Sequence, residues 1–220
     1  MKLKEGEESS ESLRGRYVYL LSPVRNVTPD QAKTIAEYAS YLEKSGAVLF
    51  NPVKDAPQQD ATGYNIVMAE LNFLQEAAKN GGRVDILWNA GGTPSEGSRV
   101  DVGMALSLGL ELNLVEIFNT GVPTGPQKCL SIINGWGNDV IFTTVRNIQN
   151  CDEVIVDWDT DMKGDEQEWQ RMYLGIALGQ MIQNPNIKLK LEKVIGIDPP
   201  EKKSYVKVMK EIEARQSTGT

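Results

Sequence analysis

Short apolar runs alternate with amphipathic segments along the first half of the chain. Each run is brief and rich in Val, Ile, Leu or Tyr, which is typical of a buried strand. Four strands are therefore predicted, over residues 17–21, 47–52, 84–88 and 112–118. The segments between them carry apolar residues at helical spacing, which predicts helices over about 29–45, 64–79 and 99–108.

The first of these helices has marked ends. Thr28 and Gln31 fit a capping box, and Pro29 suits the first helical position. Gly46 follows the last apolar residue of the helical face, where a glycine commonly ends a helix. The boundaries of this helix are therefore predicted from local chemistry alone.

The second half is less regular, but the alternation continues. Residues 152–158 and 193–198 predict two further strands. Helices are predicted over about 168–181 and 204–216. The segment 139–148 fits either a strand or a strand that enters a helix.

This order of elements predicts an α/β fold with a Rossmann-like or flavodoxin-like, doubly wound, mainly parallel sheet and helices on both faces. We expect a single domain over 15–212. A disordered leader rich in Glu and Ser precedes it over 1–14, and a frayed tail follows over 213–220. Ligands of such folds bind beyond the carboxyl ends of the strands, so the loops there hold the candidate site residues.

A faint internal repeat links the two halves. The sequence VDILW, a loop and DVGMAL resembles EVIVDW, a loop and YLGIAL. Gly103 and Ala105 match Gly175 and Ala177 in this comparison. We interpret the match as a shared packing solution, in which small residues let a helix lie close to the sheet.

Composition narrows the classes of function. The 220 residues include 30 Asp and Glu against 23 Lys and Arg, a formal net charge of -7, which disfavours a nucleic-acid partner. No apolar run reaches membrane-spanning length, and the charged N-terminus does not resemble a signal peptide. The two cysteines form no metal-binding pattern. We expect a cytoplasmic protein with a small-molecule substrate and no membrane partner.

The chain contains no histidine, which restricts its chemistry. Catalytic designs based on Ser-His-Asp or Cys-His are excluded, as is the commonest type of zinc site. Proton transfer or nucleophilic attack must use Asp, Glu, Tyr, Lys, Ser or Cys. We predict neither a metal nor a cofactor.

The stretch PSEGSRVDVGMALSLG, residues 94–109, carries the strongest candidates. In one interpretation Ser98 caps the helix and Asp101 completes a capping box, with Gly97 in the turn and Glu96 solvated. In the other, the helix N-terminus keeps Asp101 ionised as a nucleophile that attacks a sugar carbon. Glu96 is then a nearby acid or base, and the main chain around Gly97 and Ser98 binds substrate. The local pattern leaves both interpretations open.

Other candidates follow the first three strands. Ser22 and Arg25 lie in the loop after the first strand, where Arg25 could bind a phosphate or carboxylate or could simply be solvated. Asn51 ends the second strand and could contact a sugar or base, although a turn role before a proline is the simpler interpretation. Trp88 ends the third strand and could stack on a base or belong to the core.

The pattern DILW…PSEGSRVDVGMALSLG…LNLV resembles the nucleoside 2-deoxyribosyltransferase family over about residues 16–118. Residues 95–98 lie on the family's Asp-Glu-Gly-Thr loop, and residues 101–105 lie on its Glu-Leu-Gly-Tyr-Ala stretch. The resemblance places Asp101 at the position of the nucleophile and Tyr19 near the base-binding tyrosine. Glu70 falls where the family carries an acidic residue that contacts the base.

The resemblance implies cleavage or transfer of the N-glycosidic bond of a nucleoside or nucleotide. It also implies a homo-oligomer, because a neighbouring subunit commonly completes the site in that family. The family nucleophile is a glutamate, so Asp101 has a reach shorter by about 1.5 Å. This difference supports an alternative, a non-catalytic module that binds a nucleotide or nucleotide-sugar on the same fold.

Overall fold

The computed structural model describes residues 13–22, 24, 27–87, 96–115, 138–199 and 203–219. The first half of the chain forms a four-stranded parallel sheet with the order β2-β1-β3-β4. Its strands are β1 (Tyr17–Leu21), β2 (Val48–Phe50), β3 (Arg83–Leu87) and β4 (Glu111–Val115). The predicted α/β class with a mainly parallel sheet is therefore confirmed.

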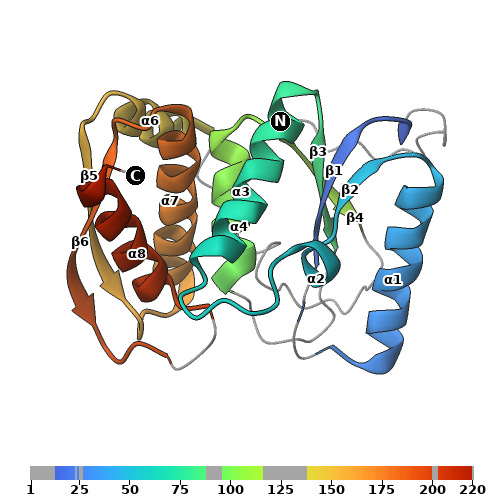
Figure 1. Ribbon diagram of the computed structural model, residues 1–220, viewed down its shortest axis with the longest axis horizontal. Helices are drawn as coiled ribbons and strands as arrows, with labels where there is room; N and C mark the ends of the chain where they lie inside the picture. Colours follow the sequence, from blue (N-terminus) through green and yellow to red (C-terminus); the bar gives the residue numbers. More distant parts are fainter. Residues whose placement is uncertain are drawn as a thin grey trace.

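Helices cover both faces of this sheet (Figure 1). Helix α1 (Pro29–Lys44) packs on one face, and α3 (Tyr64–Lys79) and α4 (Glu96–Ser107) lie on the other. Successive side chains of β1 point to opposite faces, so Val18 joins the core under α1 while Tyr19 joins the core under α3 and α4. This alternation aims Tyr19 at the helix that carries Asp101.

The second half adds a small parallel sheet of its own, formed by β5 (Glu153–Asp159) and β6 (Lys188–Ile195). Helices α6 (Asn138–Gln149), α7 (Gly164–Gln183) and α8 (Tyr205–Thr218) accompany it. Figure 1 shows α7 and α8 between this sheet and the helices of the first half. The ambiguous segment 139–148 is thus helical.

The internal repeat has a different meaning from the one expected. Gly103 of α4 and Gly175 of α7 face each other across a helix–helix contact. A Cβ atom on Gly103 would overlap the carbonyl oxygen of Met172, and one on Gly175 would overlap that of Val100. The interpretation that these residues bring a helix close to the sheet was therefore wrong, because they bring α4 and α7 close to each other.

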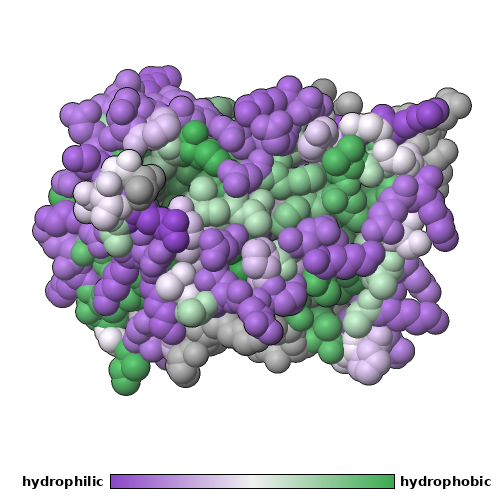
Figure 2. All heavy atoms as spheres, in the orientation of Figure 1, coloured by the Kyte–Doolittle hydropathy of each residue, from purple (hydrophilic) through white to green (hydrophobic). Residues whose placement is uncertain are grey.

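Figure 2 shows the same face as Figure 1, with apolar side chains gathered across its middle, over α3. Hydrophilic side chains border this band and cover much of α1 and α8. Within the described ranges, no helix has both the length and the apolar character needed to cross a membrane.

Candidate functional site

Helix α4 begins at Glu96, and Asp101 lies within it, five residues later. Ser98 is therefore a buried residue inside the helix and not its N-cap. The capping box of Ser98 and Asp101 was a wrong prediction, because a capping serine must precede the helix. The carboxyl group of Asp101 is free to serve another purpose.

The Asp101 carboxyl group points into the protein and meets Tyr19 of β1. The Tyr19 hydroxyl donates to Oδ2 of Asp101 at 3.2 Å. Tyr19 is held in place by its ring, which stacks on Phe50 with centroids 5.4 Å apart. Asp101 is only 7% exposed, and its Oδ1 atom has no hydrogen-bond partner among the described residues.

A buried ion pair acts on the charge of this carboxyl group. Nζ of Lys203, just before α8, lies 2.8 Å from Oε2 of Glu70 on α3, and both side chains are largely buried. Gly63, at the start of α3, has a φ of 83° and lies against the main chain of Lys203. A side chain at this glycine would push Lys203 away from Glu70.

Tyr205, the first residue of α8, completes the cluster. Nζ of Lys203 lies 5.5 Å from the centroid of its ring, and the ring of Trp158 lies 5.9 Å away. Sequence analysis did not identify Lys203 or Tyr205 as site residues. They are more than a hundred residues from Glu70 in the chain, and only the packing of α8 brings them near.

Burial dominates the electrostatics of this cluster. It raises the pKa of Asp101 well above the ordinary value, and the negative charge of Glu70 raises it further. The positive charge of Lys203 and the hydrogen bond from Tyr19 act in the opposite direction but do not cancel the increase. Asp101 lies beyond the first turn of α4, so burial, and not the helix dipole, has the larger effect on its pKa.

Tyr19, Tyr205 and Lys203 keep their protons. Burial raises the pKa of Tyr19 and that of Tyr205. Burial alone would lower the pKa of Lys203, but the charge of Glu70 and other nearby groups raises it overall. Both tyrosines are therefore hydrogen-bond donors, and Lys203 is a cation.

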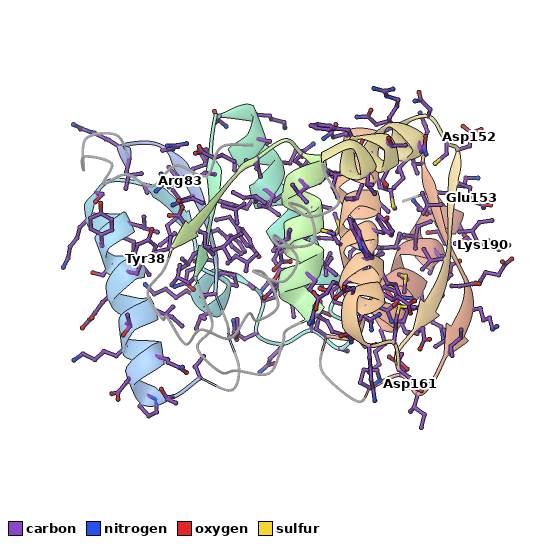
Figure 3. All side chains as sticks on the ribbon, turned by 180° about the vertical axis from the view of Figure 1, so that it is seen from behind. Tyr38, Arg83, Asp152, Glu153, Asp161 and Lys190 are labelled. Carbon is purple, nitrogen blue, oxygen red and sulfur yellow. The ribbon has the colours of Figure 1, made fainter. Side chains whose placement is uncertain are left out.

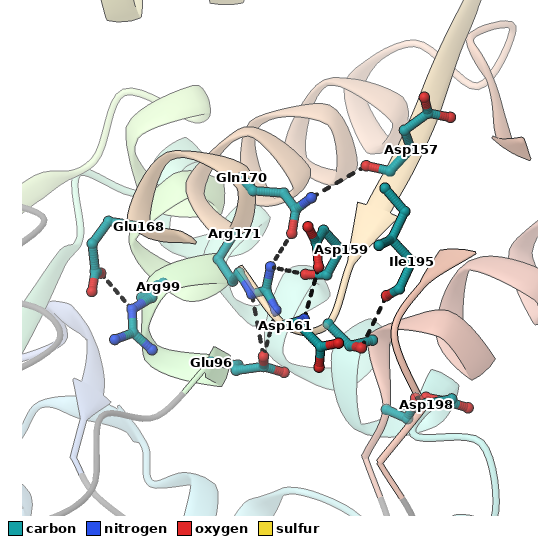
Figure 4. A network of polar contacts seen from close by, with 12 residues as sticks. Glu96, Arg99, Asp157, Asp159, Asp161, Glu168, Gln170, Arg171, Ile195 and Asp198 are labelled. Atoms are coloured by element: carbon teal, nitrogen blue, oxygen red, sulfur yellow. Dashed lines mark hydrogen bonds and ion pairs between the residues drawn. The ribbon is translucent and has the colours of Figure 1, made fainter. Parts of the chain in front are cut away.

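Glu96 belongs to a different group of polar contacts (Figure 4). Its Oε1 atom lies 2.7 Å from Nη2 of Arg171, whose guanidinium also lies 4.3 Å from the centroid of the Trp158 ring. Residues five apart on a helix point about 140° apart around its axis. Glu96 is thus directed to Arg171 of α7, and the structure does not place it on the side of α4 that carries the Asp101 carboxyl group.

A second ion pair between α4 and α7 lies beside this one (Figure 4). Nε of Arg99 contacts Oε2 of Glu168, and both side chains are almost fully buried. Sequence analysis gave neither residue a role. Together with Glu96 and Arg171, they hold the two halves of the chain against each other.

The remaining candidate site residues do not share one location in the structure. Oδ1 of Asn51 accepts from the main-chain N–H of Val53 at 3.1 Å, so Asn51 caps the short helix α2 (Pro52–Asp55), as the turn interpretation expects. Ser22 follows β1 and is buried, and its Oγ has no hydrogen-bond partner in the part of the chain that is described. Gly97 lies in the first turn of α4. Arg25 and Trp88 lie outside the described residues.

A separate polar cluster lies on the α1 face of the sheet, where Figure 3 labels Tyr38 and Arg83. The Tyr38 hydroxyl donates to Asp85 at 2.9 Å, and Asn113 donates to the other carboxylate oxygen at 2.8 Å. Arg83 forms an ion pair with the same carboxylate at 2.8 Å. Because Asp85 is saturated with partners, we assign this cluster to the stability of the sheet.

The structure describes no group of three or more Asp, Glu or Cys side chains arranged to hold a metal ion within the described ranges. No family model matches the chain, and neither a curated protein nor a solved structure matches it. The geometry around Asp101 is therefore the basis for the functional argument.

Proposed function

We propose that the chain cleaves or transfers the N-glycosidic bond of a nucleoside or nucleotide, with Asp101 as the nucleophile. One observation carries the proposal: Tyr19 holds one oxygen of a buried carboxyl group, while the other, Oδ1, has no partner among the described side and main chains. A buried polar atom without a partner costs free energy, and such atoms are rare in folded proteins. The resemblance around residues 94–109 supplies the reaction.

In the proposed reaction, Oδ1 of ionised Asp101 attacks C1′ of the sugar. The bond from C1′ to the base nitrogen breaks, and its electron pair leaves with the base, which takes up a proton. Water or a second base then attacks C1′, loses a proton and releases the Asp101 carboxylate. The reaction needs no histidine.

The surrounding residues support these steps. Tyr19 orients the carboxyl group through Oδ2 and leaves Oδ1 for the attack. The charge of Lys203 favours the ionised form of Asp101, because it lowers the pKa that burial and Glu70 raise. Glu70 also remains the candidate that contacts the base or the sugar. We give Glu96 no part in the chemistry, because Arg171 holds it in the α4–α7 contact.

We also propose that the protein is cytoplasmic, as its sequence suggests, and that it forms the homo-oligomer implied by the resemblance. Each chain nevertheless brings Lys203 and Tyr205 to Asp101 from its own C-terminal half. These groups therefore do not depend on a neighbouring subunit.

A binding module without chemistry is the second candidate. It is favoured by the raised pKa of Asp101, because a neutral carboxyl group can donate a hydrogen bond to a ligand but is a poor nucleophile. The shorter reach of aspartate compared with glutamate acts in the same direction.

The test is incubation of the protein with ribonucleosides, 2′-deoxynucleosides and their 5′-phosphates, each with and without a second free base, followed by chromatography. We expect free base or an exchanged base from the wild type and a loss of at least about 100-fold in Asp101→Asn. Asp30→Asn, which changes an acidic residue in the exposed first turn of α1, is the matched control. Ligand-induced thermal stabilisation without product would instead support the binding module.

A further inference from the structure

The small sheet of β5 and β6 has one face that no described element covers. Parallel sheets usually carry helices on both faces. Trp158 and Leu189 point inward and belong to the core that includes α7 and α8, whereas Ile155 points outward and is 54% exposed. Both strands lie at the margin of the molecule in Figures 1 and 3, with α7 on their inner side. The outer face of this sheet is therefore open to another molecule.

The outer face carries opposite charges on its two strands. Glu153 and Asp157 are exposed on β5, and Lys188 and Lys193 are exposed on β6. Glu153 is the register partner of Lys188, and Asp157 is that of Lys193. Within the described part of the chain, none of these four side chains forms an ion pair. An acidic row thus lies beside a basic row, and both rows are available to a partner.

This pattern is complementary to itself in one arrangement. If two copies pack face to face about a twofold axis that runs along the strands, β5 of each copy lies over β6 of the other. Such an axis preserves positions along the strands, so Glu153 faces Lys188 of the second copy and Asp157 faces its Lys193. A twofold axis across the strands would instead place β5 over β5, with acid against acid.

Apolar side chains add to this contact. In the same arrangement Ile155 lies over the apolar stem of Lys190, whose ammonium group is 3.5 Å from Oε1 of Glu192 on the same strand. Ile195, the last residue of β6, is 41% exposed, and Ile197 just beyond it is 85% exposed. The face is about 25 Å long and two strands wide, which is less than the roughly 800 Å² per partner of a standard interface. We therefore expect a weak dimer that dissociates on dilution.

We propose that the outer face of β5 and β6 is a docking surface for a second copy of this chain, in a twofold dimer that pairs each acidic strand with the basic strand of the other copy. The proposal is independent of the reaction at Asp101. The surface also lies outside residues 16–118, so it differs from the subunit contact that the family resemblance implies at the site.

The experiment uses three charge variants of the full chain. The acidic variant is Lys188→Glu/Lys193→Glu, the basic variant is Glu153→Lys/Asp157→Lys, and the exchanged variant combines all four substitutions. Sedimentation equilibrium measures self-association from about 10 μM to about 1 mM, the range suited to a small interface. Circular dichroism and the melting temperature at low concentration establish that each variant folds, which we expect because all four side chains are exposed.

We expect the wild type and the exchanged variant to dimerise. The acidic and basic variants should each self-associate at least about 10-fold more weakly, because like charges then face each other across the interface. An equimolar mixture of the acidic and basic variants should form a heterodimer. The matched control is Lys33→Glu/Lys44→Glu, which makes the same change of net charge at two exposed positions of α1 and should dimerise as the wild type does.

A wild type that stays monomeric over the whole range would overturn the proposal. Acidic and basic variants that dimerise as the wild type does would also overturn it, because the contact would then lie on another surface. A folded exchanged variant that remains monomeric would show that the two charged rows do not face each other. If the acidic or the basic variant fails to fold, the other variant and the exchanged variant still decide the question.

Discussion

At the scale of single residues, the protonation of Asp101 is part of the folding equilibrium. Its carboxyl group titrates near pH 3.9 in an unfolded chain, whereas burial and Glu70 raise its pKa in the folded protein. The folded protein therefore binds this proton more tightly. The resulting stabilisation is complete below about pH 3.9 and is lost as the pH rises through the folded pKa.

Asp101→Asn has no proton to lose at this position, which gives a first prediction. The free energy of unfolding of Asp101→Asn, minus that of the wild type, should increase as the pH is raised from about 4 towards neutrality. Urea unfolding at a series of pH values measures this difference. A difference that stays constant over this range would show that Asp101 is solvated in the folded protein. Asp30→Asn provides the comparison with an exposed aspartate.

Glu70 and Lys203 tune the same proton in opposite directions. Removing the negative charge in Glu70→Gln should lower the pKa of Asp101, and removing the positive charge in Lys203→Met should raise it. The acidic limb of kcat/KM against pH should therefore move to lower pH in the first variant and to higher pH in the second. If the acidic limb moved in the same direction in both variants, the assignment of this limb to Asp101 would be contradicted. The pH-dependent stability of each variant reports the same shift without turnover.

At the scale of elements, the contact between α4 and α7 depends on glycine. Gly175→Ala places a methyl group against the carbonyl oxygen of Val100, which belongs to a helix backbone and cannot rotate away. We expect a loss of about 1–3 kcal/mol in the free energy of unfolding, measured in urea. Gln183→Ala, at the exposed end of the same helix, should change stability by less than about 0.5 kcal/mol. Equal effects of the two substitutions would show that the helices are not in close contact.

The elements also show what local sequence can predict. The box of Thr28 and Gln31 forms as predicted, because both of its hydrogen bonds lie within one turn. Helix α6 could not be distinguished from a strand, because it carries Val140, Ile141, Thr143 and Thr144, β-branched residues that favour strands. Its helical state depends on packing against α7, which local patterns do not contain.

The same limit applies to the site. Asp101 and Tyr19 were candidates because of the family resemblance, and the alternation of β1 explains why Tyr19 faces α4. Lys203 and Tyr205 could not be predicted, because their sequence is that of an ordinary charged segment before an amphipathic helix. Their role depends on where α8 lies, which is decided by contacts between distant parts of the chain.

At the scale of the whole molecule, the two sheets are joined through α4 and α7, and buried ion pairs lie in this contact. Arg99 of α4 and Glu168 of α7 are 2% exposed each. Breaking a buried pair by removing one partner leaves a desolvated charge, whereas replacing both partners with apolar side chains removes that charge altogether. This difference allows the role of the pair to be tested without disturbing Asp101.

Arg99→Met should lower the free energy of unfolding by about 3–5 kcal/mol, because the Glu168 carboxylate loses the guanidinium that compensates its burial. The double variant Arg99→Met/Glu168→Met should recover most of this loss, since neither charge remains in the contact. Urea unfolding followed by both far-ultraviolet circular dichroism and tryptophan fluorescence measures the effect on the whole chain. A double variant as unstable as Arg99→Met would show that the pair itself, and not the cost of an uncompensated charge, holds the two halves together.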